Sequence, residues 1–228
     1  MVGKVLVTGS SGVIGTHLCN ILASSAIPFI GLDIRPNKWS NKVNDLTIRG
    51  DIRAKETFDK LPDDVEIIVH LAANSRVYEM LETPSLALDN FTTLHNVLEY
   101  SRANKINKVI FSSSREVYGN VEKAYASESN SEVALCESPY AASKLGGEAI
   151  INAYNNCFNL DYLIFRFSNV YGMYDESDRV IPVFLKKINM NETIEIYGSE
   201  KILDFVHIDD TVSAIKKGIV NFENVKND

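Results

Sequence analysis

The stretch KVLVTGSSGVIGTH, residues 4–17, decides the fold. A run of aliphatic residues is followed by three glycines at three-residue spacing, Gly9, Gly12 and Gly15, after which an apolar pattern resumes. This order predicts a buried strand, a tight turn and a helix. A turn without side chains lets a phosphate approach the amide groups at the helix N-terminus. The stretch therefore predicts a site for the pyrophosphate of a dinucleotide, in which the glycines permit the turn, close phosphate approach and helix packing.

Short apolar runs rich in β-branched residues recur along the chain, and segments with helical spacing separate them. The predicted strands cover residues 4–9, 28–33, 46–51, 66–73, 108–114 and 162–169. The clearest helical pattern follows Thr83-Pro84 and places apolar residues at Leu88, Phe91, Leu94, Val97 and Leu98. This alternation predicts an α/β fold with a Rossmann-type doubly wound parallel sheet, whose ligands bind at the carboxyl ends of the strands.

The alternating pattern loosens after about residue 178. We expect residues 1–175 to form the nucleotide-binding domain and residues 176–228 to form a small, partial substrate-binding lobe, with a strand and helix that return to the main domain. The segment TIEIYG, residues 193–198, predicts a short strand in this lobe. The chain is interpreted as either truncated or naturally short.

The net charge, the apolar runs and the cysteines argue against several classes of protein. The net charge is −7, and the Lys and Arg residues form no run longer than two, which argues against nucleic acid or an anionic membrane as a partner. The chain shows neither a secretion signal nor an apolar run of membrane-spanning length. Its three cysteines, Cys19, Cys136 and Cys157, form no C-x-x-C pair. The sequence therefore predicts a cytoplasmic protein without disulfide bonds or a metal site.

Asp33 ends the predicted second strand, roughly 20 residues after the glycine turn. A carboxylate at this place can accept hydrogen bonds from both ribose hydroxyls of a dinucleotide and repel a 2′-phosphate. This spacing favours NAD as the cofactor, while Arg35 nearby leaves NADP open. The competing interpretation is a solvated carboxylate at a strand end.

A candidate reactive pair lies in SPYAASKLGGEAI, residues 138–150. Ser138-Pro139 is typical of a helix start, so Tyr140 and Lys144 fall one turn apart on the same helix face. We expect the neighbouring ammonium to favour the phenolate form of the tyrosine, which could then remove a hydroxyl proton. A half-exposed tyrosine beside an ordinary surface lysine is the alternative. Ser114, after the predicted fifth strand, supports the reactive interpretation because its hydroxyl could hydrogen-bond the reacting oxygen.

The sequence resembles the extended short-chain dehydrogenase/reductase family, in particular its NAD-dependent nucleotide-sugar epimerases and dehydratases, such as the UDP-glucose 4-epimerases. The resemblance runs along almost the whole chain. In chain order, it is carried by TGSSGVIG, Asp33, GDI at 50–52, LAA at 71–73, Asn90, SSSREVYG, YAASK, RFSNVYG and DFVHIDD.

The resemblance implies a role for each matching position. The residues implied to bind NAD are Gly9, Gly12, Val13, Ile14 and Gly15 at the pyrophosphate, Asp33 at the adenosine ribose, Asp51 and Ile52 at the adenine, and Leu71, Ala72, Ala73, Asn90, Tyr140 and Lys144 near the nicotinamide ribose. Ser114, Tyr140 and Lys144 are implied to be catalytic. Ser114, Glu116 and Asn169 are implied to contact the nucleotide-sugar substrate.

The implied activity is epimerisation of a UDP-sugar at C4 through a 4-keto intermediate, by a homodimer. A nucleotide-sugar decarboxylase, a 4,6-dehydratase and a catalytically idle NAD-binding module are the alternatives. Arg115 occupies the place where dehydratase relatives carry an acid, and an ion pair between Arg115 and Glu116 is as plausible as a direct role. Leu203 occupies the place of an arginine that binds the diphosphate in many relatives, and Lys201 is a candidate substitute.

Overall fold

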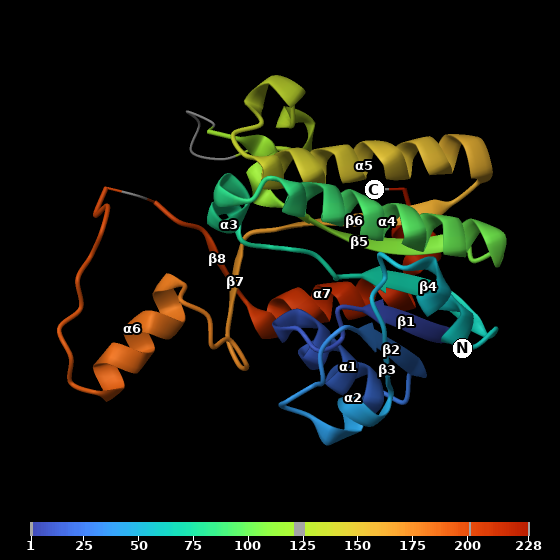
Figure 1. Cartoon of the computed structure of the whole chain (residues 1–228), viewed down its shortest axis with the longest axis horizontal. Helices are drawn as coiled ribbons and strands as arrows, with labels where there is room; N and C mark the ends of the chain where they lie inside the picture. Colours follow the sequence, from blue (N-terminus) through green and yellow to red (C-terminus); the bar gives the residue numbers. More distant parts are fainter. Residues whose placement is uncertain (1, 121–125, 201, 228) are drawn as a thin grey trace.

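The computed structural model describes residues 2–120, 126–200 and 202–227. Its centre is a six-stranded parallel sheet with the strand order β3-β2-β1-β4-β5-β6 (Figure 1). The strands are β1 (Lys4–Thr8), β2 (Phe29–Asp33), β3 (Thr47–Arg49), β4 (Val65–His70), β5 (Lys108–Ser114) and β6 (Asp161–Phe167). All six predicted strands are confirmed.

Both faces of the sheet are buried, as the apolar strands predict. Successive residues of β1 point to opposite faces, so Val5 and Val7 enter one core cluster while Leu6 enters another. These three side chains have no exposed surface. A strand that is apolar on both sides is stable in water only when helices cover both faces, which explains the doubly wound arrangement.

Helices cover the two faces (Figure 1). One layer holds α1 (Val13–Ser24) and α7 (Ile208–Val220), and the other holds α4 (Ser85–Ala103) and α5 (Pro139–Phe158). The remaining helices are α2 (Asn41–Asp45), α3 (Val77–Glu82), α6 (Val180–Asn189), α8 (Phe222–Val225) and the 3-10 turns η1 (Lys55–Lys60), η2 (Arg115–Tyr118), η3 (Glu128–Asn130) and η4 (Val133–Leu135). In the described part of the chain, no helix is long and apolar enough to cross a bilayer.

The strand order indicates where a ligand would bind. The chain runs outward from β1 to β3 and then crosses to the other side of β1 with β4, so the topological direction reverses between β1 and β4. In parallel sheets, ligands bind at the carboxyl ends of the strands beside such a reversal. The loops after β1, β2, β4 and β5 therefore define the candidate site.

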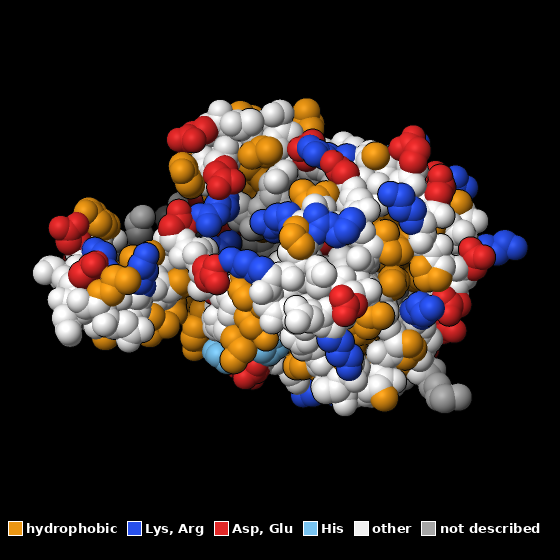
Figure 2. Space-filling view, turned by 60° about the horizontal axis from the view of Figure 1, so that its bottom comes forward, with side chains coloured by type: hydrophobic (Ala, Val, Ile, Leu, Met, Phe, Trp, Pro, Cys, Tyr) orange, Lys and Arg blue, Asp and Glu red, His pale blue; other side chains and the backbone are white. Residues whose placement is uncertain are grey.

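The last quarter of the chain divides into a projecting part and a returning part. Helix α6 and the segment after it project from the main body (Figure 1), and apolar side chains lie on the surface of this projection (Figure 2). Strands β7 (Asn169–Tyr171) and β8 (Phe205–His207) form a separate parallel pair, and α7 then packs against α1. A returning strand and helix are therefore present, while the domain boundary at residue 175 stays a prediction.

The strand predicted at residues 193–198 is wrong. The structure shows irregular chain there, with Ile196 and Tyr197 exposed by 69% and 84%. A strand needs a neighbouring strand to pair its backbone groups, and the segment has none within the described ranges. Apolar alternation alone was not a sufficient signal. Lys201, the candidate substitute for the diphosphate-binding arginine, lies outside the described residues.

Candidate active site

The glycine turn between β1 and α1 has the geometry that its sequence predicts. Gly9 has a φ of 74°, and a Cβ there would lie 2.8 Å from the Ala72 amide nitrogen. A Cβ on Gly15 would lie 2.1 Å from the Gly9 carbonyl oxygen, so the helix packs directly on the turn. A Cβ on Gly12 would meet only that same oxygen, at 3.3 Å, among the described residues. The middle glycine therefore has an open side.

The start of α1 fits an anion. Gly12 caps this helix without a side-chain hydrogen bond, and the first turn carries no acidic residue in the described structure. The first amide groups of a helix have no partners within the helix, and their dipoles favour negative charge. The backbone around Val13, Ile14 and Gly15 is therefore suited to a phosphate, and the residues present fit a dinucleotide pyrophosphate.

Asp33 is held in place at the end of β2. One carboxylate oxygen accepts a hydrogen bond from the Ser11 amide at 2.9 Å, and the other accepts one from the Arg35 amide at 2.8 Å. Each oxygen keeps further acceptor capacity for a ribose hydroxyl. The Arg35 side chain is exposed, whereas its carbonyl accepts a hydrogen bond from the Ser11 hydroxyl.

Asn37 is a positioning residue of this loop that the sequence analysis missed. Its side-chain amide nitrogen donates to the Ser10 carbonyl at 3.2 Å and to the Thr16 hydroxyl at 2.7 Å, and its oxygen accepts from the amide of Trp39. It thereby joins the loop after β2 to the glycine turn. Its place in a polar loop offered no periodic signal.

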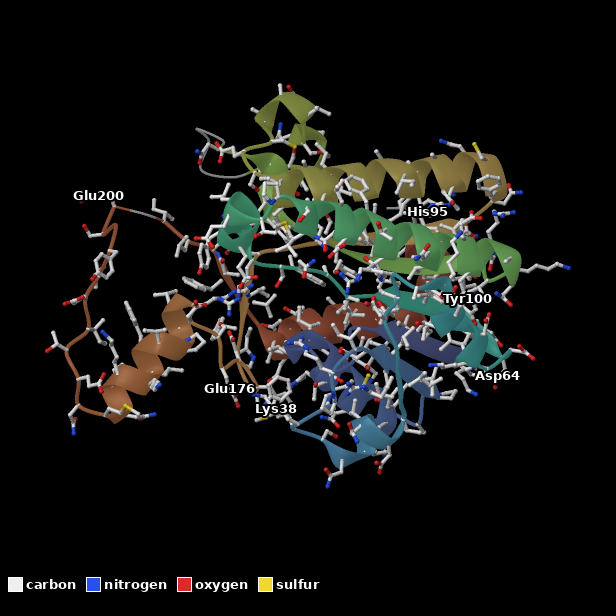
Figure 3. All side chains as sticks on the ribbon, viewed as in Figure 1. Lys38, Asp64, His95, Tyr100, Glu176 and Glu200 are labelled. Atoms are coloured by element: carbon white, nitrogen blue, oxygen red, sulfur yellow. The ribbon has the colours of Figure 1, made fainter. Side chains whose placement is uncertain are left out.

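A clasp links the loop after β2 to the segment after β7. Trp39 stacks on Tyr174 with ring centroids 5.4 Å apart and donates to a Glu176 carboxylate oxygen at 3.3 Å. Lys38 forms an ion pair with the same glutamate, and Figure 3 shows these two side chains side by side. The clasp brings the adenosine side of the site against the chain that leads into α6.

Two predicted adenine contacts have other partners in the structure. The Asp51 carboxylate is bonded by the Arg53 guanidinium at 2.7 Å, and this hydrogen bond holds the pKa of Asp51 below its usual range. Ile52 is only 5% exposed and belongs to the core, with its carbonyl accepting a hydrogen bond from Asn96 at 2.9 Å. Their contact with adenine stays a prediction.

The chain after β4 lies against the glycine turn. The Leu71 amide donates to the Thr8 carbonyl at 3.2 Å, while Ala72 and Ala73 continue along the carboxyl edge of the sheet. Asn90 on α4 fixes the next residue, because it accepts from the Asn74 amide at 2.8 Å and donates to the Asn74 carbonyl at 3.0 Å. It also donates to a serine hydroxyl on α5 at 3.1 Å, so it joins this edge to the helix of the reactive pair.

The reactive pair lies on α5 as predicted. The Ser138 hydroxyl caps the helix by accepting from the Ala141 amide at 3.0 Å, and Pro139 is its first residue. Tyr140 and Lys144 are 8% and 4% exposed, so the surface-residue alternative is wrong. The Lys144 ammonium lies 5.8 Å from the centre of the Tyr140 ring.

The pKa of Tyr140 departs from the expectation. Burial raises it, while hydrogen bonding to Ser114 and the charge of Arg179 lower it, so the net shift is upward. The expected lowering by Lys144 is therefore corrected. The ammonium is directed elsewhere, since it donates to the Ser112 carbonyl at 2.7 Å. Burial also lowers the pKa of Lys144 to about 8.

The loop after β5 brings two predicted substrate residues to the pair. Ser114 is 7% exposed and accepts a hydrogen bond from the Glu116 amide at 3.2 Å. The Glu116 carboxylate forms an ion pair with Arg115 at 3.0 Å and raises the pKa of Tyr140 by its charge. The ion pair that the sequence analysis gave as one interpretation of Arg115 and Glu116 is thus present. A direct contact of Glu116 with substrate stays a prediction.

Asn169 lies on β7, away from the hydrogen bonds that join the reactive group. Its side-chain amide donates to the Asp204 carbonyl at 2.8 Å, which fastens β7 to the chain that enters β8. Leu203, beside this contact, is 42% exposed. Contact between Asn169 and a substrate phosphate stays a prediction.

The fold and this group of residues define a Rossmann-type nucleotide-dependent enzyme scaffold. The model of the NAD dependent epimerase/dehydratase family matches residues 5–228, so the chain belongs to that family. The family is NAD-dependent, as the glycine turn and Asp33 predicted.

Several proteins are similar to the chain along most of its length. Protein CapI of Staphylococcus aureus is 31% identical over 230 residues, which cover 94% of this chain and 68% of CapI. A putative UDP-glucose 4-epimerase of Methanocaldococcus jannaschii is 34% identical over 219 residues, which cover 92% of this chain and 71% of that protein.

Solved structures agree with the fold. The dTDP-glucose 4,6-dehydratase DesIV of Streptomyces venezuelae, solved with NAD bound, has a TM-score of 0.85 and 29% identity over 95% of this chain and 71% of its own. The chain also spans only 58% of the length of a Dictyostelium discoideum dTDP-D-glucose 4,6-dehydratase. Similar proteins thus include both epimerases and dehydratases, and the class they define is the nucleotide-sugar epimerase/dehydratase.

Proposed function

We propose that the protein binds NAD at the glycine turn and epimerises a nucleotide sugar, most specifically a UDP-sugar, at C4. The observation that carries this proposal is the convergence of Ser114, Tyr140 and Lys144 at the carboxyl edge of the sheet. Binding of a dinucleotide alone does not require this combination of hydroxyl, phenol and amine. The idle-module interpretation therefore has less support.

The residues divide the chemistry between them. When bound at the glycine turn, NAD would supply a hydride acceptor and later a hydride donor. Tyr140 removes the proton of the sugar hydroxyl, and Ser114 orients the oxygen that loses it. The resulting 4-keto sugar changes configuration if it turns before it is reduced on the opposite face. Tyr140 then returns the proton to the new hydroxyl.

The ion pair after β5 favours epimerisation over 4,6-dehydration. Elimination of water requires a proton donor beside the base, and the guanidinium of Arg115 does not release a proton at physiological pH. Arg115 is instead bound to the Glu116 carboxylate at 3.0 Å. A simple exchange of hydride and proton at C4 needs neither side chain as an acid.

Product analysis tests the proposal. The protein is incubated with NAD and a panel of UDP-, dTDP- and GDP-sugars, and products are identified by NMR beside a Tyr140→Phe control. We expect a 4-epimer from the unsubstituted protein only, because phenylalanine keeps the ring and loses the proton-transferring oxygen. Carbon dioxide or a 4-keto-6-deoxy sugar would replace this proposal with the decarboxylase or dehydratase. Binding without turnover across the panel would favour the idle module.

We further propose a cytoplasmic homodimer paired through α4 and α5. Leu88 on α4 is 66% exposed and Phe158 at the end of α5 is 50% exposed, so both helices carry apolar side chains outward. Burial of such residues between two copies removes apolar surface from water.

A further inference from the structure

A buried ion pair lies beneath the catalytic helix. The Arg166 guanidinium on β6 contacts both carboxylate oxygens of Glu148 on α5, at 3.0 Å and 2.7 Å. The two side chains are only 16% and 8% exposed. Removing two charges from water is costly, and apolar residues of similar size often stabilise a core equally well. The pair is therefore a candidate for a role beyond stability.

Three parts of the chain fix the ion pair between Glu148 and Arg166. The Ser113 hydroxyl on β5 donates to the oxygen that Arg166 also contacts. The guanidinium has two further partners in the loop after β5, the Glu128 carbonyl at 2.7 Å and the Ser131 hydroxyl at 3.0 Å. The bidentate contact with Arg166 thus holds the negative charge of Glu148 in one position.

Lys144 lies one helical turn before Glu148 on α5. The groups that face the buried ammonium are the Ser112 carbonyl at 2.7 Å, the Phe111 ring at 5.0 Å, the Tyr140 ring at 5.8 Å and the His70 imidazole of β4. His70 is neutral, because burial lowers its pKa to about 3. The charge of Glu148 raises the pKa of Lys144 and opposes the stronger effect of burial.

We propose that Glu148 is a positioning residue for the reactive pair: its carboxylate, fixed by Arg166 and Ser113, keeps the buried Lys144 amine charged at neutral pH. This inference rests on the proposed function only in treating Tyr140 and Lys144 as catalytic. A charged amine has three N–H donors, one of which is held by the Ser112 carbonyl, whereas a neutral amine has two donors and no charge. Arg166 holds the carboxylate of Glu148 in place, and its positive charge partly offsets the effect of that carboxylate on the pKa of Lys144.

Direct titration of Lys144 tests this proposal without substrate. The Cε resonances of ¹³C-lysine-labelled protein are followed against pH by NMR, and Lys144 is assigned from the Lys144→Arg variant. The unsubstituted protein should titrate near 8. Glu148→Gln should lower this pKa by about one pH unit, whereas Arg166→Gln, which leaves the carboxylate uncompensated, should raise it. Unchanged values, or shifts in the same direction, would overturn the proposal.

The controls separate charge from loss of structure. Glu148→Gln/Arg166→Gln replaces both charges with amides that can still hydrogen-bond. Its Lys144 pKa should lie below that of the unsubstituted protein, because the carboxylate charge is lost, and above that of Glu148→Gln, because the repelling guanidinium is lost as well. If either single variant fails to fold, this double variant carries the test, and a titration identical to that of the unsubstituted protein overturns the proposal. Glu99→Gln on α4 is the matched control, because Glu99 also pairs with an arginine, Arg102. It should leave the Lys144 titration unchanged.

Kinetics provide an independent measure once a substrate is known. The alkaline limb of kcat should move to lower pH in Glu148→Gln, with a smaller change in KM, because the amine loses its proton earlier. An unmoved limb beside normal turnover contradicts the role of Glu148 and leaves the proposed activity intact. Absence of turnover on every sugar contradicts the activity, while the NMR titration still decides the role of Glu148.

Discussion

The glycine turn offers a paired prediction, because two of its glycines have opposite surroundings. Gly12→Ala should leave the fold intact and weaken NAD binding. Its φ of −79° is allowed for alanine, and the new Cβ would meet only one oxygen at 3.3 Å in the described structure. The expected loss of stability is about 1 kcal/mol, since alanine is the poorer N-cap residue. The methyl group would stand where the pyrophosphate must approach.

The magnitude follows from mass action. At an NAD concentration of about 100 Kd, binding raises the free energy of unfolding by about 2.7 kcal/mol. A tenfold weaker variant should gain only about 1.4 kcal/mol at the same concentration. Chemical denaturation with and without NAD measures both values, and calorimetry gives the Kd directly.

Gly15→Ala is the contrasting variant. Its Cβ would lie 2.1 Å from the Gly9 carbonyl oxygen and 2.8 Å from the Ser10 Cα, so the turn or the helix must move. Overpacking of this kind costs about 1–3 kcal/mol. The unfolding midpoint should fall even without NAD. Tight NAD binding by Gly12→Ala, or full stability of Gly15→Ala, would refute the assignment of the turn.

Other predictions concern the helices. Ser138→Ala should lower the free energy of unfolding by about 1 kcal/mol, measured by denaturant titration, because the Ala141 amide loses its cap. Lys144 should make stability rise with pH above about 8: its folded pKa is below the ordinary 10.5, so the unfolded chain binds more protons in that range. Lys144→Met should remove this slope, and a slope that persists contradicts the buried amine. Leu88→Lys should convert the proposed dimer into a monomer in light scattering, whereas a dimer of unchanged affinity would place the interface elsewhere.

The fold was predictable because its signals are local. The run KVIFSSS became β5 with identical bounds, Lys108–Ser114, since apolar residues on both faces specify a buried strand. Ser138-Pro139 likewise gave the start of α5. The segment TIEIYG failed because pairing with another strand is not encoded within the segment itself. Leu88 shared the helical spacing of its neighbours and is nevertheless exposed.

The sequence indicated which residues lie together in the candidate site, but it did not indicate their pKa values. The spacing of Tyr140 and Lys144 placed them on one helix face, yet the pKa of Tyr140 depends on its burial and on Ser114 and Arg179. Tertiary packing decides which charged groups from distant parts of the chain lie near Tyr140, and the local sequence pattern does not reveal this. Glu148 carried a usable signal, its place one turn after Lys144. Arg166 lies in the motif RFSNVYG, but nothing in the sequence marked it as the partner of Glu148.

The return of α7 to the main body has a consequence for synthesis. Ile208, Val212, Ile215 and Ile219 on this helix fill the same core cluster as Val5 and Val7 of the first strand. A ribosome delivers that first strand long before the helix that covers it. We therefore expect the part of this sheet face that α1 does not cover to stay exposed in the nascent chain until α7 has been translated, and to depend during that time on chaperones that shield apolar surface.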